Sequence, residues 1–203
     1  MDNLPCVQNH ETKLYWLINM VKDLRQSTPK TILYVQNLRQ CETLYMWMME
    51  ELETSAYVDC TPKISNRMIE MYHSRTDDKS VHRILSEYKT PESSIRIIFA
   101  TVAFGLGIDI PDINIIIHWG ISSTIMTFWQ EIGRCSRDGT EGISYIYPYA
   151  RSISQCQDKQ LQAIVKGTEC YRKQILDIFL LKGMNSTVSK PIPCDTNEFD
   201  SIV

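Results

Sequence analysis

Apolar side chains recur along the chain with two different periods, and these periods predict its helices and strands. Between residues 10 and 26 they fall three or four positions apart, which is typical of an amphipathic helix. The run 31–35 is short, apolar and rich in β-branched residues, which predicts a buried strand. The same two patterns predict further strands at 68–73, 95–100, 113–118 and 143–147, and further helices at 40–53, 77–88, 124–135, 152–165 and 168–181.

The predicted strands alternate with helices of about 10–15 residues. Such alternation is typical of a mainly parallel sheet with helices on both faces, so we expect an α/β fold of three layers, α-β-α. In sheets of this kind ligands lie beyond the carboxyl ends of the strands. The residues directly after each strand are therefore the first place to look for a site. From residue 183 onward, small polar residues and two prolines predict a flexible tail.

Composition and charge narrow the class of protein. Of the 203 residues, 43% are hydrophobic and 22% are charged, which excludes a chain that is disordered throughout. No apolar run approaches the roughly 18 residues of a membrane span, and the amino terminus does not resemble a signal peptide, so we expect an intracellular protein with no membrane partner. The net charge of −3 does not by itself indicate nucleic acid. Any phosphate site must come from the local placement of side chains.

Seven cysteines are scattered along the chain without a C-x-x-C pair. An odd number with irregular spacing favours free thiols in a reducing compartment. Cys135 lies between two arginines, at a position where we expect small apolar packing. The alternative is that the adjacent positive charges lower its pKa and make it oxidisable.

A segment after the strand 95–100 carries residues suited to phosphate chemistry. Gly105 and Gly107 let the backbone approach a phosphate or another chain closely, and Asp109 is a carboxylate that suits a ribose hydroxyl. Thr101 offers a hydroxyl and a backbone N–H at the end of the strand. Taken alone, this segment is better interpreted as a tight turn between two strands.

A second segment follows the strand 113–118. Gln130, Arg134 and Arg137 are spaced i, i+4 and i+7, so we expect one helical face to present an amide and two guanidinium groups. Guanidinium groups suit phosphate oxygens. The alternative is a solvated helix face on which Arg134 pairs with Glu131 or Asp138, and the spacing alone favours this alternative.

Together the two segments resemble a known family. The strings ATVAFGLGIDIPDI (100–113) and WQEIGRCSRDG (129–139) resemble motifs V and VI of superfamily 2 helicases, most closely those of the RecQ family. The strings TILYVQN (31–37) and YHSRTD (72–77) resemble motif IV and the segment that follows it. The resemblance implies the second RecA-like domain of a two-domain motor at 1–150, the helical start of a degenerate zinc-binding region at 151–182, and a tail at 183–203.

The resemblance also implies roles for individual residues. Three of them would face the γ-phosphate of ATP across a cleft: Gln130, Arg134 and Arg137. Three would lie at the nucleotide: Asp109, Gly107 and Gly105. Three would hold the backbone of a single DNA strand, through contacts that do not depend on sequence: Thr101, Asn37 and Arg39. Of the two arginines, Arg137 is favoured as the arginine finger, with Arg134 as its neighbour.

The ATP site implied by the resemblance is incomplete in this chain. No G-x-x-x-x-G-K-[ST] loop and no D-E-x-H or D-E-x-D segment occurs, and in the family both lie on the first RecA-like domain. ATP and Mg²⁺ would be shared with such a first domain, in cis or in trans, and we expect no useful hydrolysis by this chain alone. The alternative is a non-catalytic nucleic-acid- or partner-binding module descended from a helicase domain.

The remaining expectations concern metal and substrate. The segment 169–179 resembles the start of the RecQ zinc-binding region, but only Cys170 and Cys194 are left to ligate, so we expect two free thiols and no zinc. The resemblance implies a 3′–5′ helicase acting on single-stranded or forked DNA, with a role in DNA repair and recombination and a nuclear location. Motif VI of RNA motors of the DEAD-box type normally opens with histidine, whereas Gln130 stands here.

Overall fold

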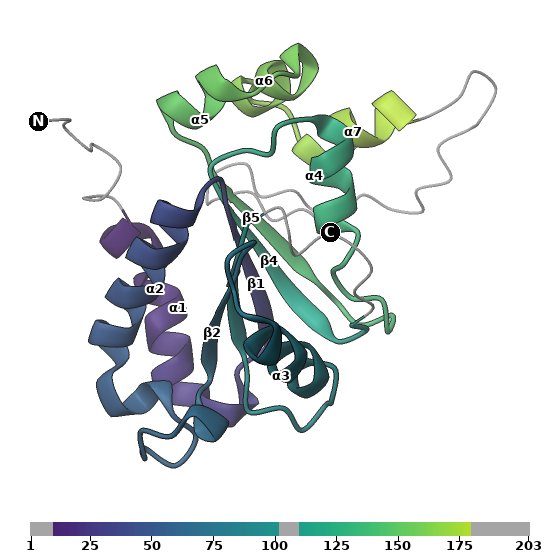
Figure 1. Cartoon of the computed structure of the whole chain (residues 1–203). Helices are drawn as coiled ribbons and strands as arrows, with labels where there is room; N and C mark the ends of the chain where they lie inside the picture. The colour runs from purple at the N-terminus through teal and green to yellow at the C-terminus, as the bar shows by residue number, and fades with distance from the viewer. Residues whose placement is uncertain (1–9, 102–109, 180–203) are drawn as a thin grey trace, which may run out of the picture.

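The computed structural model describes residues 10–101 and 110–179, and these residues form one five-stranded sheet with helices on both faces (Figure 1). The strand order is β2-β3-β1-β4-β5, and all four neighbouring pairs are parallel. The strands are β1 (Lys30–Val35), β2 (Ile69–Tyr72), β3 (Ile97–Ala100), β4 (Ile113–Trp119) and β5 (Ile143–Tyr147). The predicted α/β fold with a mainly parallel sheet is confirmed.

Helices cover the sheet on both sides, as in the predicted three layers. They are α1 (His10–Leu24), α2 (Leu38–Leu52), α3 (Asp78–Tyr88), α4 (Ile125–Ile132), α5 (Ala150–Gln155), α6 (Lys159–Lys166) and α7 (Tyr171–Phe179). Helices α1 and α2 pack on one face, while α3, α4, α6 and α7 pack on the other. Each face has its own core because successive strand residues point to opposite sides, so Leu33 joins the first core and Ile32 the second.

The predicted helix 152–165 is wrong in one respect, because the chain forms two helices there. The break lies at Asp158, whose carboxylate accepts hydrogen bonds from the N–H groups of Gln160 (2.9 Å) and Leu161 (3.1 Å) and so caps α6. The same carboxylate accepts from the N–H of Ile125 at 3.0 Å, at the start of α4. Because one side chain caps two helices, it fixes α6 against α4.

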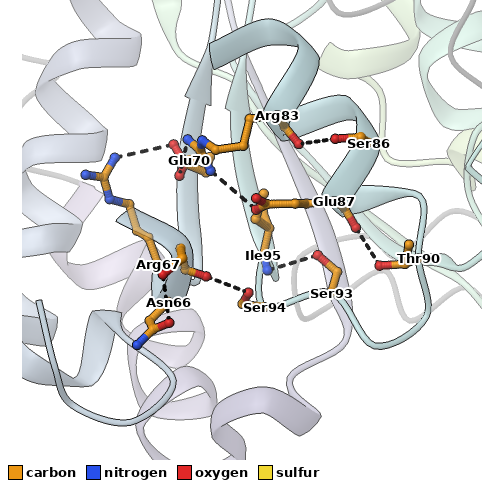
Figure 2. Close-up of polar contacts among 11 residues, drawn as sticks. Asn66, Arg67, Glu70, Arg83, Ser86, Glu87, Thr90, Ser93, Ser94 and Ile95 are labelled. Atoms are coloured by element: carbon orange, nitrogen blue, oxygen red, sulfur yellow. Dashed lines mark hydrogen bonds and ion pairs between the residues drawn. The ribbon is translucent and has the colours of Figure 1, made fainter. Parts of the chain in front are cut away.

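An ion-pair network secures the edge strand β2 to helix α3 (Figure 2). Glu70 on β2 is only 3% exposed, and its carboxylate meets Arg83 on α3 at 2.7 Å and Arg67 at 3.4 Å. Arg83 also reaches Glu87 one turn further along α3, at 3.4 Å. Burial raises the pKa of the Glu70 carboxyl above its usual value, against the opposing pull of the two arginines.

None of the helices in the described part of the chain is both long and apolar enough to cross a membrane.

Candidate functional site

The residues predicted to hold DNA lie together at the carboxyl edge of the sheet. Because β1 and β3 are parallel neighbours, Asn37 and Arg39 after β1 lie at the same edge of the sheet as Thr101 after β3. Asn37 and Arg39 are exposed, and Thr101 is half-buried. The segments after β1 and β3 therefore offer a guanidinium, an amide and a hydroxyl at one edge of the sheet, and these are donors suited to phosphate oxygens.

Two of these residues also have structural roles that the sequence analysis missed. The side-chain oxygen of Asn37 accepts a hydrogen bond from the N–H of Gln40 at 3.0 Å and caps α2. The N–H of Thr101 donates to the carbonyl of Tyr72 at 3.3 Å. The prediction that this N–H is available to a ligand is wrong, because it extends the pairing between the ends of β2 and β3.

A hydrogen-bond network ties together the segments that follow β1, β4 and β5. The hydroxyl of Tyr149 donates to Gln36 Oε1 at 3.1 Å and accepts from Gln40 Nε2 at 2.6 Å. Gln36 Nε2 in turn donates to the carbonyl of Ile121 at 2.7 Å. Gly120 adopts a φ of +100°, and a side chain there would press on Gln36. The network fixes the loops at the carboxyl edge relative to one another.

The two motif arginines lie beyond the end of α4, in residues 133–138, which we call the arginine loop. Helix α4 ends at Ile132, with Gly133 as its C-cap. Ser136 adopts a φ of 52°, a conformation that no α-helix contains. The predicted helix through residue 135, with Gln130, Arg134 and Arg137 on one face, is therefore wrong.

Backbone hydrogen bonds explain why the helix stops where it does. The N–H of Ser136 donates to the carbonyl of Ile113 at 2.7 Å, and the N–H of Asp138 donates to the carbonyl of Pro111 at 3.2 Å. These bonds hold the arginine loop against the start of β4. The seven residues of β4 span roughly 20 Å. The backbone of the arginine loop thus lies at the opposite end of the strand from the carboxyl edge, which the sequence had indicated as the first place to look for a site.

The two arginines differ in their surroundings. Arg137 is exposed, and its Nε donates to the carbonyl of Gly133 at 3.1 Å within the same loop. Arg134 is only 8% exposed, and its charge opposes the rise in the pKa of the nearby Tyr34 hydroxyl. Gln130 is exposed on α4. An exposed guanidinium fits an anionic ligand such as a phosphate, so the geometry fits Arg137 better than Arg134 for that contact.

Three predicted nucleotide-binding residues lie outside the described residues: Gly105, Gly107 and Asp109. The structure does not place them.

A buried polar cluster lies between α4 and the sheet, and the sequence analysis missed it. The Oε2 atom of Glu131, on α4, accepts a hydrogen bond from Ser122 Oγ and lies 3.1 Å from His118 Nε2. Glu131 is 4% exposed. The His118 ring stacks on the ring of Tyr34, with centroids 5.4 Å apart. The sequence did contain one sign that Glu131 is buried, because Glu131 falls on the same face of the predicted helix as the apolar Phe128.

This cluster borders a cavity of about 190 Å³ at the carboxyl edge. Tyr34 and His118 line it on the sheet side, and Gln36, Gly120 and Ser122 line it on the loop side. Burial raises the pKa of the Tyr34 hydroxyl, and the charge of Glu131 adds to the rise. Tyr34 therefore stays protonated at physiological pH.

The cysteines correct two points of the sequence analysis. Burial raises the pKa of the Cys135 thiol, whose Sγ packs 3.3 Å from the carbonyl of Asn114, so the alternative of lowering by the arginines is wrong. Cys170 is disulfide-bonded, whereas a free thiol was expected. Four other cysteines are free as expected: Cys41, Cys60, Cys135 and Cys156. Among the described residues, no three His, Cys, Asp or Glu side chains gather as metal ligands.

Comparison with known proteins settles the family. Residues 12–139, more than half of the chain, match the family described as the helicase conserved C-terminal domain. The chain belongs to this family. The resemblance to the RecQ branch is confirmed by its relatives. This helicase domain is 32% identical, over 140 residues, to the RecQ-like DNA helicase blm-1 of Caenorhabditis elegans, and 38% identical, over 141 residues, to the probable ATP-dependent DNA helicase RecS of Bacillus subtilis.

The solved structures agree on the fold of this helicase domain. Domain 2 of the DEAD-box helicase Mss116p, bound to an RNA duplex, superposes on 87% of the chain with a TM-score of 0.58 and 15% identity, and 57% of that chain is covered. The blm-1 match covers 68% of this chain and 13% of the relative, and the RecS match covers 63% and 28%. The chain thus spans less than a third of the length of each of these two relatives.

Proposed function

We propose that this chain is the second motor domain of a RecQ-type, ATP-dependent 3′–5′ DNA helicase. The observation that carries the proposal is the placement of Arg137. It is exposed on a loop that two backbone hydrogen bonds hold at the amino end of β4, while Asn37, Arg39 and Thr101 gather at the carboxyl edge. Two separate groups of phosphate-binding side chains are what a motor needs when it holds a nucleotide in one place and a DNA backbone in another.

In this proposal the arginine loop completes an ATP site that a first motor domain supplies with its phosphate loop and magnesium ligands. ATP with Mg²⁺ would provide the phosphoryl group whose transfer to water releases energy. Arg137 would stabilise negative charge that develops on the phosphate oxygens, a contribution worth on the order of 10³–10⁵ in rate in well-studied systems. Gln130 would stand beside it, and Arg134 would support the loop from within.

The carboxyl edge would carry one part of the single-strand track. Arg39 would pair with a phosphate, and the hydroxyl of Thr101 and the amide of Asn37 would donate to neighbouring oxygens. Such contacts are independent of base sequence, as a translocating motor requires, and they weaken with rising salt. The protein would act on single-stranded or forked DNA in repair and recombination, in the nucleus.

The proposed organisation keeps the boundaries given by the sequence. Residues 1–150 would form the RecA-like domain, 151–182 the helical remnant of a zinc-binding region, and 183–203 a tail. Binding of zinc is not proposed.

The test is ATP hydrolysis, with and without single-stranded DNA, by the chain alone and mixed with a RecQ-type first motor domain. We expect turnover only in the mixture, and we expect Arg137→Ala to abolish it while DNA binding by the chain persists. Turnover that is unaffected by Arg137→Ala would refute the role of the arginine. No turnover in the mixture, with DNA or protein binding retained, would favour the alternative of a non-catalytic binding module.

A further inference from the structure

A lysine is buried at the amino end of the central strand, and the proposed function does not use it. Lys30, the first residue of β1, is 1% exposed. Its ammonium group donates to the carbonyls of Tyr88 and Thr90, both at 2.8 Å, and lies 2.7 Å from a carboxylate oxygen of Asp112. A lysine ammonium has three hydrogens, and three groups surround this one.

Burial of the Lys30 ammonium costs free energy, and the groups around it offset that cost. Removal from water lowers the pKa of Lys30, and the carboxylate of Asp112 opposes the effect. A buried charge is strongly unfavourable unless it is paired and hydrogen-bonded. The buried ammonium of Lys30 therefore depends on the three groups that surround it.

Asp112 connects the lysine to the arginine loop. Asp112 lies between Pro111 and Ile113, and the carbonyls of these two residues accept the N–H groups of Asp138 and Ser136. Arg137 stands between those two donors in the sequence. Lys30 is also paired directly with Ile113 across the β1–β4 ladder, at a point where the register shifts. The contacts of Lys30 thus reach the backbone segment that holds the arginine loop.

We propose that Lys30 is a positioning residue for Arg137, acting through Asp112. The ion pair holds the turn at residues 111–113 against the end of α3, and that turn holds the arginine loop by its two carbonyls. Lys30 touches no nucleotide in this arrangement. It determines where the guanidinium of Arg137 stands, and this second proposal therefore rests on the first.

The first measurement uses the chain alone and needs no activity. Amide hydrogen exchange at Ser136 and Asp138 reports whether the arginine loop stays bonded to the turn. We expect Lys30→Met to speed exchange at both amides by about tenfold or more relative to the rest of the sheet, and Asp112→Asn to speed it in the same place by less. Asp112→Asn keeps the lysine bonded to both carbonyls, so it remains informative if Lys30→Met does not fold.

Glu70→Gln is the matched control, because it breaks another buried ion pair that contacts α3 but leaves the pair of Lys30 and Asp112 intact. It should leave exchange at Ser136 and Asp138 unchanged relative to the sheet. The proposal is overturned if Lys30→Met and Asp112→Asn change these two amides no more than Glu70→Gln does.

The second measurement separates positioning from stability. In the mixture with a first motor domain, Lys30→Met should lower kcat by about tenfold and leave KM for ATP within about twofold, because misplacement of Arg137 weakens the transition state more than the ground state. An unchanged kcat in an active mixture would refute positioning. If the unsubstituted mixture itself is inactive, the proposed function fails, whereas the exchange experiment still decides whether Lys30 holds the loop.

Discussion

Removal of the Glu131 carboxylate tests how much the buried polar cluster stabilises the domain. Both Ser122 Oγ and His118 Nε2 meet one oxygen of this carboxylate, Oε2, and all three residues are at most 8% exposed where they border the cavity of about 190 Å³. The change Glu131→Ala takes away that acceptor and leaves two polar groups without it beneath α4. A water that took the place of the lost oxygen would itself need hydrogen-bond partners, so it would offset the loss only in part.

The size of the loss in stability follows from the two polar groups that lose their partner. A buried polar group deprived of its partner costs about 1–3 kcal/mol, so two of them should lower the free energy of unfolding by about 3 kcal/mol. For a domain of this size, each kcal/mol corresponds to about 2–4 °C in Tm, which gives a fall of about 6–12 °C. The same change at Glu141, which is exposed, should cost less than about 0.5 kcal/mol.

Urea unfolding followed by circular dichroism measures these differences, and Glu131→Gln sharpens the test. Because both partners meet the same oxygen, an amide oxygen in that position can accept both hydrogen bonds, so Glu131→Gln should cost less than half of what Glu131→Ala costs. If Glu131→Ala costs under about 1 kcal/mol, the cluster does not stabilise the fold as argued. If Glu131→Gln is as harmful as Glu131→Ala, charge rather than hydrogen bonding holds the cluster together.

Two further outcomes are expected. Burial raises the pKa of the Glu70 carboxyl above 4.5, so the folded state holds this proton more tightly than the unfolded chain does. The stability that this group contributes is therefore lost as the pH rises from about 4.5 through the folded pKa. Urea unfolding across that window should show the stability of the unsubstituted chain falling relative to that of Glu70→Gln, and a difference that does not change with pH contradicts the argument. Asn37→Asp should keep the cap of α2, and with it the stability of the domain, but should weaken the binding of single-stranded DNA. Asn37→Ala should lower the free energy of unfolding by about 1 kcal/mol because it removes the cap. If Asn37→Asp binds DNA as tightly as the unsubstituted chain, Asn37 is not part of the proposed track.

The strands were predictable from sequence because each is a short segment of mainly buried residues, with isoleucine most frequent in β3 and β4. Five short apolar runs gave five strands, with ends within one or two residues of the structure. Helix ends were harder to predict, because tertiary partners decide them. Asp158 stops one predicted helix by capping the next, and its bond to the N–H of Ile125 joins residues 33 positions apart. The spacing of apolar residues along the chain cannot reveal a contact between residues so far apart in the sequence.

The buried charges were missed for a different reason. Sequence patterns treat Lys30 and Glu131 as polar residues that belong on the surface, and both are almost completely buried. Each is tolerated only because the fold brings partners from distant segments, Tyr88 and Asp112 to the lysine, and His118 and Ser122 to the carboxylate. For Glu131 the available signal was a charge on the apolar face of a predicted helix, whereas Lys30 lay just outside the predicted strand 31–35 and gave no such signal.

The position of the arginine loop follows from topology rather than from side-chain chemistry. A helix that connects two parallel strands must return the chain to the amino edge of the sheet, so whatever follows such a helix lies opposite whatever precedes it. Gly120 precedes α4 and lies at the carboxyl edge, while Arg137 follows α4 and lies at the amino end of β4. Motif VI spans the end of the returning helix, and for that reason the backbone of its arginines lies at the opposite edge from Asn37 and Thr101, although the charges of both arginines still act on the Tyr34 hydroxyl. The strand β4 and helix α4 therefore keep the proposed nucleotide contact and the proposed DNA contact apart while joining them through one rigid unit.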